Sequence, residues 1–312
     1  MSALRVLAPG FLTTVQDLGR FGHGEEGVSA AGAADSLALR LGNRLLGNVE
    51  GAPALEMTLA GGTFVFERPV AGVLAGADFG ARLGGAPAPP WIGFQASAGQ
   101  TLAVGPTREG ARVYLCLRGG IDVPRVMGSA STHLLTGIGG MGGRALRAGD
   151  VLALGPEPTL PVRAVAPESL RALRGGGPLR FTPGLQGDWF EREAHALLAS
   201  AEWTVLEGSD RTGLRLAGPG LPQRILDELP TEGAPLGAIQ VPRDGGPILL
   251  FVDHQTTGGY PKIGNVVAAD LPRLGQLRPR DTLRFQPVGF EEALALLLAQ
   301  EEALDALWSD DA

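Results

Sequence analysis

The sequence predicts a mainly β protein made of two β-rich units, with a few short helices and a helix at the C-terminal end. Three observations support this fold class. The 312 residues include 48 glycines and 24 prolines, about twice the usual share of turn formers, and these are spread between short apolar runs. Hydrophobic residues make up 44% of the chain and charged residues 19%, which is typical of a globular protein with a substantial core. Residues 179–183 resemble the start of the chain, and this weak repeat indicates that the two halves share an architecture.

Strands and one helix are expected in the first half. Residues 4–8 alternate in polarity and end at a Pro-Gly pair, which predicts a strand, whereas the polar, glycine-rich residues 13–32 predict a loop. Residues 35–46 predict a helix, because leucines recur at four-residue spacing, Asp35 can cap the start and Gly47-Asn48 can stop the end. The clearest further strands are residues 63–67, 70–75, 112–117 and 151–154.

A stretch rich in proline and glycine separates the two halves. Residues 155–178 hold several prolines, a short Leu/Arg helix candidate and a Gly-Gly-Gly-Pro run, so we predict domains at residues 1–160 and 179–312 with a linker at 161–178. Helices are expected at residues 190–201 and 289–308, the second of them amphipathic. Strands are expected at residues 179–183, 239–241, 248–252, 265–268 and 282–285.

Composition and charge exclude several classes of protein. The net charge is −7 and the basic residues form no stripe, so neither nucleic acid nor an anionic membrane is an expected partner. The single cysteine, Cys116, allows no internal disulfide and lies in an apolar strand, where a thiol is typically a small buried hydrophobe. Residues 1–10 lack the features of a signal peptide and no segment reaches 18 uninterrupted apolar residues, so a soluble cytoplasmic protein is expected.

The sequence supports neither of two common nucleotide-binding patterns. Residues 137–142 read Gly-Ile-Gly-Gly-Met-Gly and match the dinucleotide fingerprint, but a strand is expected after them, where the fingerprint needs a helix. A glycine turn is therefore the better interpretation. The sequence has no phosphate-binding Gly-Lys-Ser/Thr run, and its four histidines show no metal-ligand spacing, so no metal site is predicted.

Four segments are denser in Gly, Asp, Arg, Ser and Thr than core packing requires. The first three are residues 13–20, 32–56 and 118–132. Their candidate catalytic residues are Asp17 and Arg20, and their candidate substrate-binding residues are Asp35, Asn43, Arg118, Asp122, Ser129, Ser131 and Thr132.

Structural alternatives stay open in these three segments. Asp17 and Arg20 flank a glycine, so they are either an arginine fork aimed at a carboxylate or phosphate, or a surface loop pair. Asp35 is equally a helix N-cap. Arg118 and Asp122 are equally an ion pair across a turn.

The fourth segment, residues 240–262, gives the strongest functional signal. Its candidate catalytic residues are Lys262 and Asp253, and its candidate substrate-binding residues are Gln240, Gln255, Thr256, Thr257, Gly258, Gly259 and Tyr260. Glycines let backbone N–H groups approach an anion closely, and hydroxyls add further donors. Lys262 is the only lysine among 26 basic residues, which indicates a task that arginine cannot perform, such as providing a compact cation. The alternative is a polar turn in which the lysine stands by chance.

Several long motifs occur in a fixed order along the chain. They read TVQDLGRFG, GNRLLGN, LRGGIDVP, GSAST, GGRALRAGD, SDRTGLRL, GAIQVPRDG and DHQTTGGYPKIGNVVAADLPRLGQLRP. Together they resemble the family of biotin-dependent carboxyltransferases that includes allophanate hydrolase subunit 2 and the C subunit of 5-oxoprolinase. The resemblance runs from about residue 4 to residue 285, which is most of the chain.

The resemblance implies a fold of two cyclophilin-like β-barrel units. It also implies a hydrolase that works with a related B subunit and an A subunit, opens 5-oxoproline to L-glutamate at the expense of ATP, and is inactive alone. The implied chemistry is phosphorylation of the amide oxygen followed by hydrolysis. In this interpretation Lys262, Arg20 and Arg118 hold anionic groups, and Asp253 or Asp17 handles a proton or metal. Thr256, Thr257 and Ser129 donate hydrogen bonds.

Two other branches of the family give alternative functions. One is the carboxyltransferase component of a urea or amide carboxylase, in which the biotin is carried by a partner. The only lysine follows Pro261 instead of lying in a Met-Lys carrier hairpin, so this chain is not expected to carry biotin. The other alternative is a non-enzymatic antagonist of a histidine-kinase inhibitor.

Overall fold

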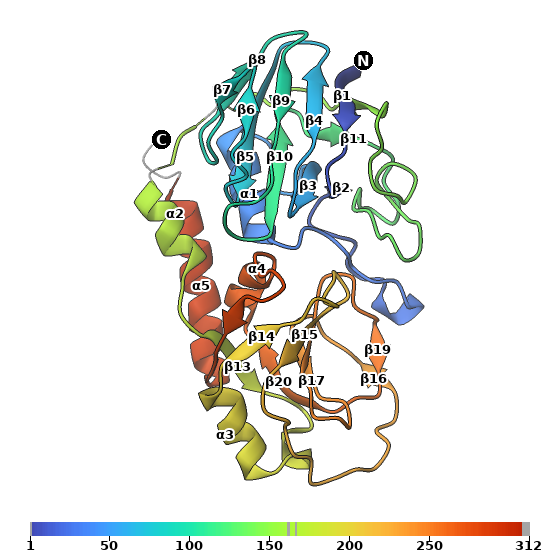
Figure 1. Ribbon diagram of the computed structural model, residues 1–312, viewed down its shortest axis with the longest axis vertical. Coiled ribbons are helices and arrows are strands. Elements are labelled where there is room, and N and C mark those ends of the chain that lie inside the picture. Colours follow the sequence, from blue (N-terminus) through green and yellow to red (C-terminus); the bar gives the residue numbers. More distant parts are fainter. Residues whose placement is uncertain (1, 161–162, 166, 308–312) are drawn as a thin grey trace. The chain divides into compact units, whose positions relative to one another are not determined.

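A computed structural model describes residues 2–160, 163–165 and 167–307 of the chain (Figure 1). The chain divides into two compact units, the first comprising residues 1–21 and 31–167 and the second residues 22–30 and 168–312. Strands dominate both units, so the predicted mainly β class with two β-rich units is confirmed. No pattern in the sequence indicated that residues 22–30 lie with the second unit. The domain boundaries at residues 160 and 179 stay a prediction.

The first unit is built from two antiparallel sheets. One has the strand order β11-β12-β1-β4-β9-β6-β7 and the other β2-β3-β10-β5-β8. The strands of the larger sheet are β1 Ser2–Ala8, β4 Thr63–Phe66, β6 Arg82–Leu83, β7 Ala86–Pro87, β9 Thr101–Ala103, β11 Ile121–Asp122 and β12 Val151–Leu154. Those of the smaller sheet are β2 Leu12–Gln16, β3 Ala54–Thr58, β5 Val70–Gly76, β8 Phe94–Ala96 and β10 Arg112–Leu117. Buried residues of both sheets, including Val6, Phe64, Leu55 and Val113, form one core cluster, so the sheets pack against each other.

Helix α1, Ser36–Leu45, confirms the predicted helix. Asp35 is its N-cap and accepts a hydrogen bond from Ala38 N at 2.9 Å. The leucine face is buried and packs on β5 and β10. Gly47 has a φ of 72° just past the end of the helix, in the left-handed region where glycine is favoured.

The loop predicted at residues 13–32 is wrong at its start, where strand β2 runs. Thr13, Thr14 and Gln16 are buried there although they are polar. The sequence of β2 therefore shows no alternation of apolar and polar residues from which its burial could be predicted. Farther along, Ser29 Oγ donates to Val252 O at 3.3 Å, which ties residues 22–30, with the 3-10 helix η1 Gly24–Glu26, to the second unit.

One eight-stranded sheet forms the centre of the second unit, in the order β21-β14-β15-β18-β17-β20-β13-β22. Its strands are β13 Leu179–Pro183, β14 Trp203–Val205, β15 Gly213–Ala217, β17 Ala238–Gln240, β18 Ile248–Leu250, β20 Lys262–Val266, β21 Thr282–Leu283 and β22 Phe285–Pro287. β21 and β22 lie at opposite edges although only Arg284 separates them in sequence, so the sheet curls into a nearly closed barrel. A two-stranded sheet pairs β16 Glu232–Gly233 with β19 Thr257–Gly258.

Helices accompany the second sheet (Figure 1). They are α2 Pro167–Arg174, α3 Arg192–Ser200, α4 Leu271–Leu274 and α5 Phe290–Ala306, with the 3-10 helices η2 Gly187–Trp189 and η3 Ala268–Asp270. α5 confirms the predicted C-terminal helix, whose expected last residue, 308, lies outside the described residues. The strand predicted at residues 265–268 instead begins at Lys262, so this lysine lies on a strand. In the described ranges, no helix is long and apolar enough to span a bilayer.

Candidate functional site

Lys262 is a buried cation at the first position of β20. It is the register partner of Gln240 on β17, and its side chain is 3% exposed. Its Nζ lies 2.5 Å from Oε1 of Glu232 on β16. A buried charge is stable only when it is paired, so Glu232 is what allows the ammonium group to lie here.

Gln186 holds both members of this ion pair. Its Nε2 donates to Glu232 Oε1 at 2.9 Å, and its Oε1 accepts from Lys262 N at 3.2 Å. The close approach of the Lys262 ammonium group is the main cause that lowers the pKa of Glu232, and the hydrogen bond from Gln186 acts in the same direction, while partial burial opposes both. The three residues form one positioned polar group.

Two buried donor groups of this cluster have no well-directed hydrogen-bond acceptor among the described residues. Within the described residues, Gln240 Nε2 is buried without an acceptor, and Lys262 Nζ has its ion pair but no well-directed hydrogen bond. Gln255 Nε2 lies 3.5 Å from Gln240 Oε1, and a Cβ atom at Gly258 would lie 3.0 Å from Gln240 Nε2 and 3.4 Å from Gln255 Nε2. Buried donors without acceptors are costly, so the arrangement suits an incoming carbonyl, carboxylate or phosphoryl oxygen.

The same segment borders an open pocket of about 490 Å³. Gly259, Tyr260 and Pro261 line one part of it, and the Tyr260 side chain is half exposed. The other lining residues are Gln223, Asp227, Glu228, Leu229, Pro242, Arg243 and Asp244. The pocket is large enough for a small molecule, and it lies next to the three residues that precede Lys262.

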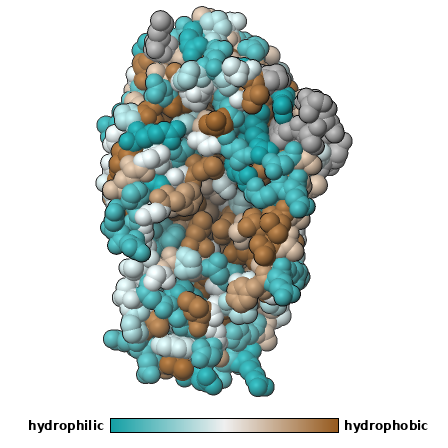
Figure 2. Space-filling view, turned by 180° about the vertical axis from the view of Figure 1, so that it is seen from behind, coloured by the Kyte–Doolittle hydropathy of each residue, from teal (hydrophilic) through white to brown (hydrophobic). Residues whose placement is uncertain are grey.

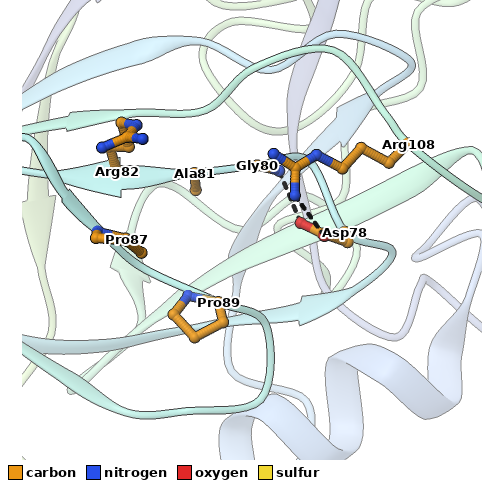
Figure 3. A pocket seen from close by; sticks show the side chains of 7 residues that line it. All are labelled: Asp78, Gly80, Ala81, Arg82, Pro87, Pro89 and Arg108. Atoms are coloured by element: carbon orange, nitrogen blue, oxygen red, sulfur yellow. Dashed lines mark hydrogen bonds and ion pairs between the residues drawn. The ribbon is translucent and has the colours of Figure 1, made fainter.

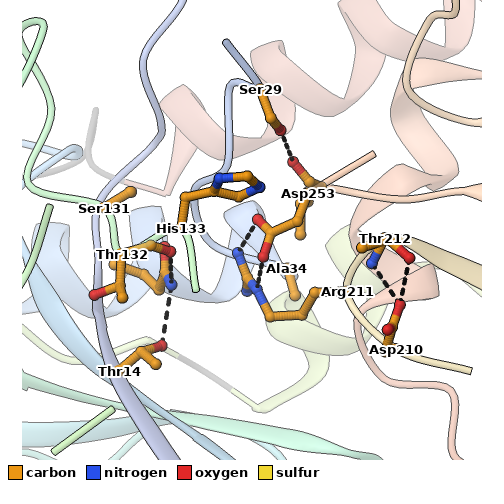
Figure 4. A network of polar contacts seen from close by, with 12 residues as sticks. Thr14, Ser29, Ala34, Ser131, Thr132, His133, Asp210, Arg211, Thr212 and Asp253 are labelled. Carbon is orange, nitrogen blue, oxygen red and sulfur yellow. Dashed lines mark hydrogen bonds and ion pairs between the residues drawn. The ribbon is translucent and has the colours of Figure 1, made fainter. Parts of the chain in front are cut away.

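Asp253, the second predicted catalytic residue of this segment, is engaged by Arg211 (Figure 4). Arg211 Nε and Nη2 donate to the two carboxylate oxygens at 2.8 and 2.9 Å, and both side chains are 6% exposed. Both carboxylate oxygens of Asp253 are therefore already engaged by one guanidinium group. Of the neighbouring threonines, Thr256 offers its backbone carbonyl to Ala234 N, and Thr257 is exposed on β19.

In the first unit, Asp17 is the acceptor of a dense buried network. Its Oδ1 accepts from Ser129 Oγ and Ser131 Oγ, each at 2.6 Å, and from Gly19 N at 2.8 Å, while its Oδ2 accepts from Ala130 N at 2.7 Å. Arg20 donates through Nη2 to Ser131 O. The structure brings these predicted residues together, and the bonds of Asp17 resemble a structural brace more than a proton-transfer site.

Thr132 extends this network along β2. Its Oγ1 donates to Val15 O at 3.0 Å, and Gln16 Nε2 donates to Thr132 O and Thr14 Oγ1, both at 3.0 Å (Figure 4). Residues 129–132 of the predicted third segment are therefore hydrogen-bonded to β2 and to Asp17, which follows it.

Three further predicted residues of the first unit form hydrogen bonds between their side chains and backbone groups. Asp35 caps α1, and Asn43 Nδ2 donates to Ala52 O at 2.8 Å and to Glu50 O at 3.0 Å. Arg118 donates to the carbonyls of Leu46, Pro158 and Leu160 at 2.7 to 2.9 Å.

The ion pair considered between Arg118 and Asp122 is not formed. Arg118 Nε lies 3.9 Å from Glu157 Oε2, whereas Asp122 is exposed at the end of β11, with Ala153 of β12 as its register partner. The expected turn at residues 137–142 is confirmed. Each of Gly139, Gly140 and Gly142 has a positive φ, and the segment forms no helix.

Glu232, Gln186 and Arg211 contact the predicted residues of this candidate site, but they were not among the residues predicted from the sequence. Arg211 lies in the motif SDRTGLRL, which is as rich in Gly, Ser and Thr as the four segments, whereas Glu232 and Gln186 lie outside them. For Glu232 the usable signal was the isolation of Lys262, since a buried lysine requires an acidic partner somewhere in the chain.

A second pocket, of about 200 Å³, lies in the first unit (Figure 3). Asp78, Arg82, Pro87 and Arg108 are among its lining residues. Arg108 is 70% exposed and pairs with Asp78 at 3.2 Å, so its charge is largely satisfied by the protein and by water. Among the described residues, no group of three or more His, Cys, Asp or Glu side chains is placed to hold a metal ion.

Comparison with known proteins places the chain among carboxyltransferases. The family model for the carboxyltransferase domain, subdomain A and B, matches residues 26–287. The chain is 39% identical to the C subunit of 5-oxoprolinase of Haemophilus influenzae over 295 residues, 94% of each chain, and 39% identical to that of Escherichia coli over 306 residues, 97% of each chain. The crystal structure of Kluyveromyces lactis urea carboxylase matches with a TM-score of 0.93 and 34% identity, covering 98% of this chain but only 29% of that one.

Proposed function

Because the chain belongs to the carboxyltransferase family with subdomains A and B, we propose that it is the C subunit of an ATP-dependent 5-oxoprolinase, acting with partner A and B subunits. The observation that carries the proposal is the match to two proteins named as C subunits of 5-oxoprolinase, at 39% identity over almost the whole length of both chains. The reaction would be the hydrolytic opening of 5-oxoproline to L-glutamate, with no activity from this chain alone.

The chemistry of the substrate suits the Lys262 cluster. The carboxylate and the ring carbonyl of 5-oxoproline carry oxygens that accept hydrogen bonds, and the cluster offers the ammonium of Lys262 and the amide of Gln240 as buried donors. Negative charge develops on the amide oxygen during attack on the amide carbon. Fixed donors in a poorly hydrated site stabilise such charge more strongly than water does.

ATP would supply a phosphoryl group to the amide oxygen. The phosphorylated amide is easier to attack at its carbon atom. This chain's own residues bind and orient the cyclic amide. Lys262 and Gln240 contact its oxygens, Glu232 and Gln186 fix the position of the ammonium group, and Tyr260 borders the pocket beside them. The donors of this cluster would also suit a phosphoryl oxygen, so they remain useful after transfer.

The test is reconstitution of the complex. This chain is co-expressed with the A and B subunits encoded beside it, and ATP-dependent release of glutamate from 5-oxoproline is measured, with each subunit omitted in turn. We expect glutamate only when all three are present. A complete complex that releases no glutamate from 5-oxoproline would contradict the proposal.

A second candidate is amide carboxylation, because the chain superimposes on part of urea carboxylase with a TM-score of 0.93. In that case a partner must carry the biotin, since Lys262 is 3% exposed and ion-paired and so cannot be the attachment residue. Supplying a biotin carboxylase and its carrier protein distinguishes the two functions. Turnover of urea or another amide that requires them, together with no glutamate release, would support carboxyl transfer.

A further inference from the structure

Helix α5 carries large apolar side chains on its outward face. Phe290, Leu294 and Leu298 are 71%, 58% and 53% exposed. They recur every four residues and therefore share one side of the helix. The sequence predicted an amphipathic helix, whose outward face should be polar, so this exposed stripe is a departure that requires an explanation.

The opposite face of α5 is already occupied by the second unit. Ala293 and Leu296 pack against the cluster of Val267, Ala269 and Val288, and Leu304 is buried. Gln300 Nε2 donates to Ala269 O at 3.1 Å and to Leu173 O at 3.3 Å. These contacts fix the rotation of the helix, so the stripe cannot turn inward. The middle of α5, residues 293–299, is apolar all round, and such a stretch is normally covered on every side.

Charge limits what can cover the stripe. Glu291 and Glu302 are exposed and border it, and residues 290–306 contain five acidic residues and no basic ones. Pairing of two copies through α5 would bring acids together in either orientation, because acidic residues lie near both ends of the helix. An anionic membrane surface is disfavoured for the same reason.

We infer that the outward face of α5, defined by Phe290, Leu294 and Leu298 with Glu291 and Glu302 at its rim, is a docking surface for another subunit of the enzyme complex. The partner presents an apolar groove bordered by Lys or Arg. Three large apolar anchors on a pre-formed helix are the usual pattern of a helix-in-groove interface. The inference rests on the proposed function only in that it takes the partner from the same complex.

The first experiment replaces the anchors with charge. Leu294→Glu with Leu298→Glu is expected to raise the dissociation constant for the co-purified partner subunits about 10-fold or more, because each leucine acts as a buried anchor. Ile92→Glu is the matched control, since Ile92 is a 62% exposed residue of the first unit. It should leave the dissociation constant unchanged. Both variants should keep the wild-type melting temperature, because neither change touches the core.

A second pair of variants separates the acidic rim from the stripe. Glu291→Lys with Glu302→Lys keeps all three apolar anchors, so binding should weaken at low salt and lose the salt dependence of the wild-type complex. Unchanged partner binding by both double variants would overturn the inference. So would a wild-type chain that forms no complex, or one that self-associates through α5 in light scattering. Glutamate release is measured in parallel, and an assembled but inactive wild-type complex counts against the proposed function while leaving this surface intact.

Discussion

At the residue scale, Lys262 shows how burial turns a common side chain into a specific donor. We expect Lys262→Met to lower glutamate release by the assembled complex about 10²-fold or more, the usual effect of removing one donor from a charge-stabilising site. Lys262→Arg should not restore it, because the planar guanidinium is wider and cannot take the same position beside Glu232. The rate is measured at saturating substrate. Arg215→Met, at an exposed arginine of β15, is the control that should retain full activity.

Glu232 gives this site a pH-dependent stability. Its pKa is lowered from 4.5 by Lys262, so the pair contributes its full stability above pH 4.5 and loses it as the pH falls through the lowered pKa. The difference in melting temperature between the wild-type chain and Glu232→Gln should therefore be constant above pH 4.5 and shrink below it. A difference that stays unchanged in acid would show that the ion pair does not contribute in this way.

Asp17 illustrates the opposite outcome, a predicted catalytic residue whose bonds are structural. Asp17→Ala leaves two serine hydroxyls and two backbone N–H groups without their acceptor, so we expect the free energy of unfolding to fall by about 3 kcal/mol. Ser129→Ala removes one of the four donors to Asp17 and the acceptor of Ser131 N, so it should cost about 1–2 kcal/mol. Denaturant unfolding measures both. Equal effects from the two variants would contradict a network centred on Asp17.

The sequence revealed the residues that share one segment but not those that complete the site. Gln240, Gln255, Gly258 and Lys262 were singled out because they are concentrated in a short, glycine-rich stretch, and they do meet in space. Glu232 could not be found in this way. It reaches Lys262 through the pairing of β16 with β19, and short strands of this kind leave no periodic pattern in a sequence.

At the element scale, helix α1 was predictable and strand β2 was not. The leucine spacing and the capping by Asp35 are local, so the sequence contains them in full. The β2 strand is held by buried polar residues whose partners lie more than 100 residues away, such as Thr132 for Gln16. Patterns of hydrophobicity do not record those partners.

The packing of α1 on β5 and β10 leads to a test at one glycine. A Cβ atom at Gly42 would lie 2.7 Å from Cys116 Sγ and 2.8 Å from Ala75 Cβ. Alanine is favoured over glycine in a helix by about 1 kcal/mol, but overpacking of this kind costs about 1–3 kcal/mol. We expect Gly42→Ala to lower the melting temperature. Combining it with Cys116→Ala should recover part of the loss, whereas a higher melting temperature for Gly42→Ala alone would show that the helix can shift away from the sheet.

At the scale of the whole molecule, the fold class could be predicted while the closure of the second sheet could not. Glycine and proline content indicated many turns, and the short strands β13 and β12 were placed at the correct residues. The parallel pairing of β13 with β22 is the step that brings the sheet edges together. It joins residues about 100 positions apart and rests on three residue pairs, which is too small a feature for the sequence to reveal.

The two units are expected to differ in acid. In the second unit the pKa of His254 is lowered by burial. The ion pair with Lys262 lowers the pKa of Glu232. Burial opposes the shift at Asp270, but hydrogen bonds from Arg180 lower its pKa. Glu232 and Asp270 stabilise the folded state above their ordinary values of 4.5 and 3.8, and this contribution is lost as the pH falls through the lowered pKa. Burial penalises the charged form of His254, so the folded state loses stability as the pH falls below its ordinary value of 6.5.

In the first unit, the hydrogen bond from Arg144 lowers the pKa of Asp150, whose ordinary value is 3.8. The second unit should therefore begin to lose stability at a higher pH than the first. Hydrogen exchange followed peptide by peptide, corrected for the intrinsic effect of pH, would show protection falling first in β17, β18 and β20. Arg180→Met should advance that loss, because it leaves the Asp270 carboxylate, 1% exposed, without its bidentate partner. Earlier loss of protection in β3 and β10 of the first unit would contradict this order.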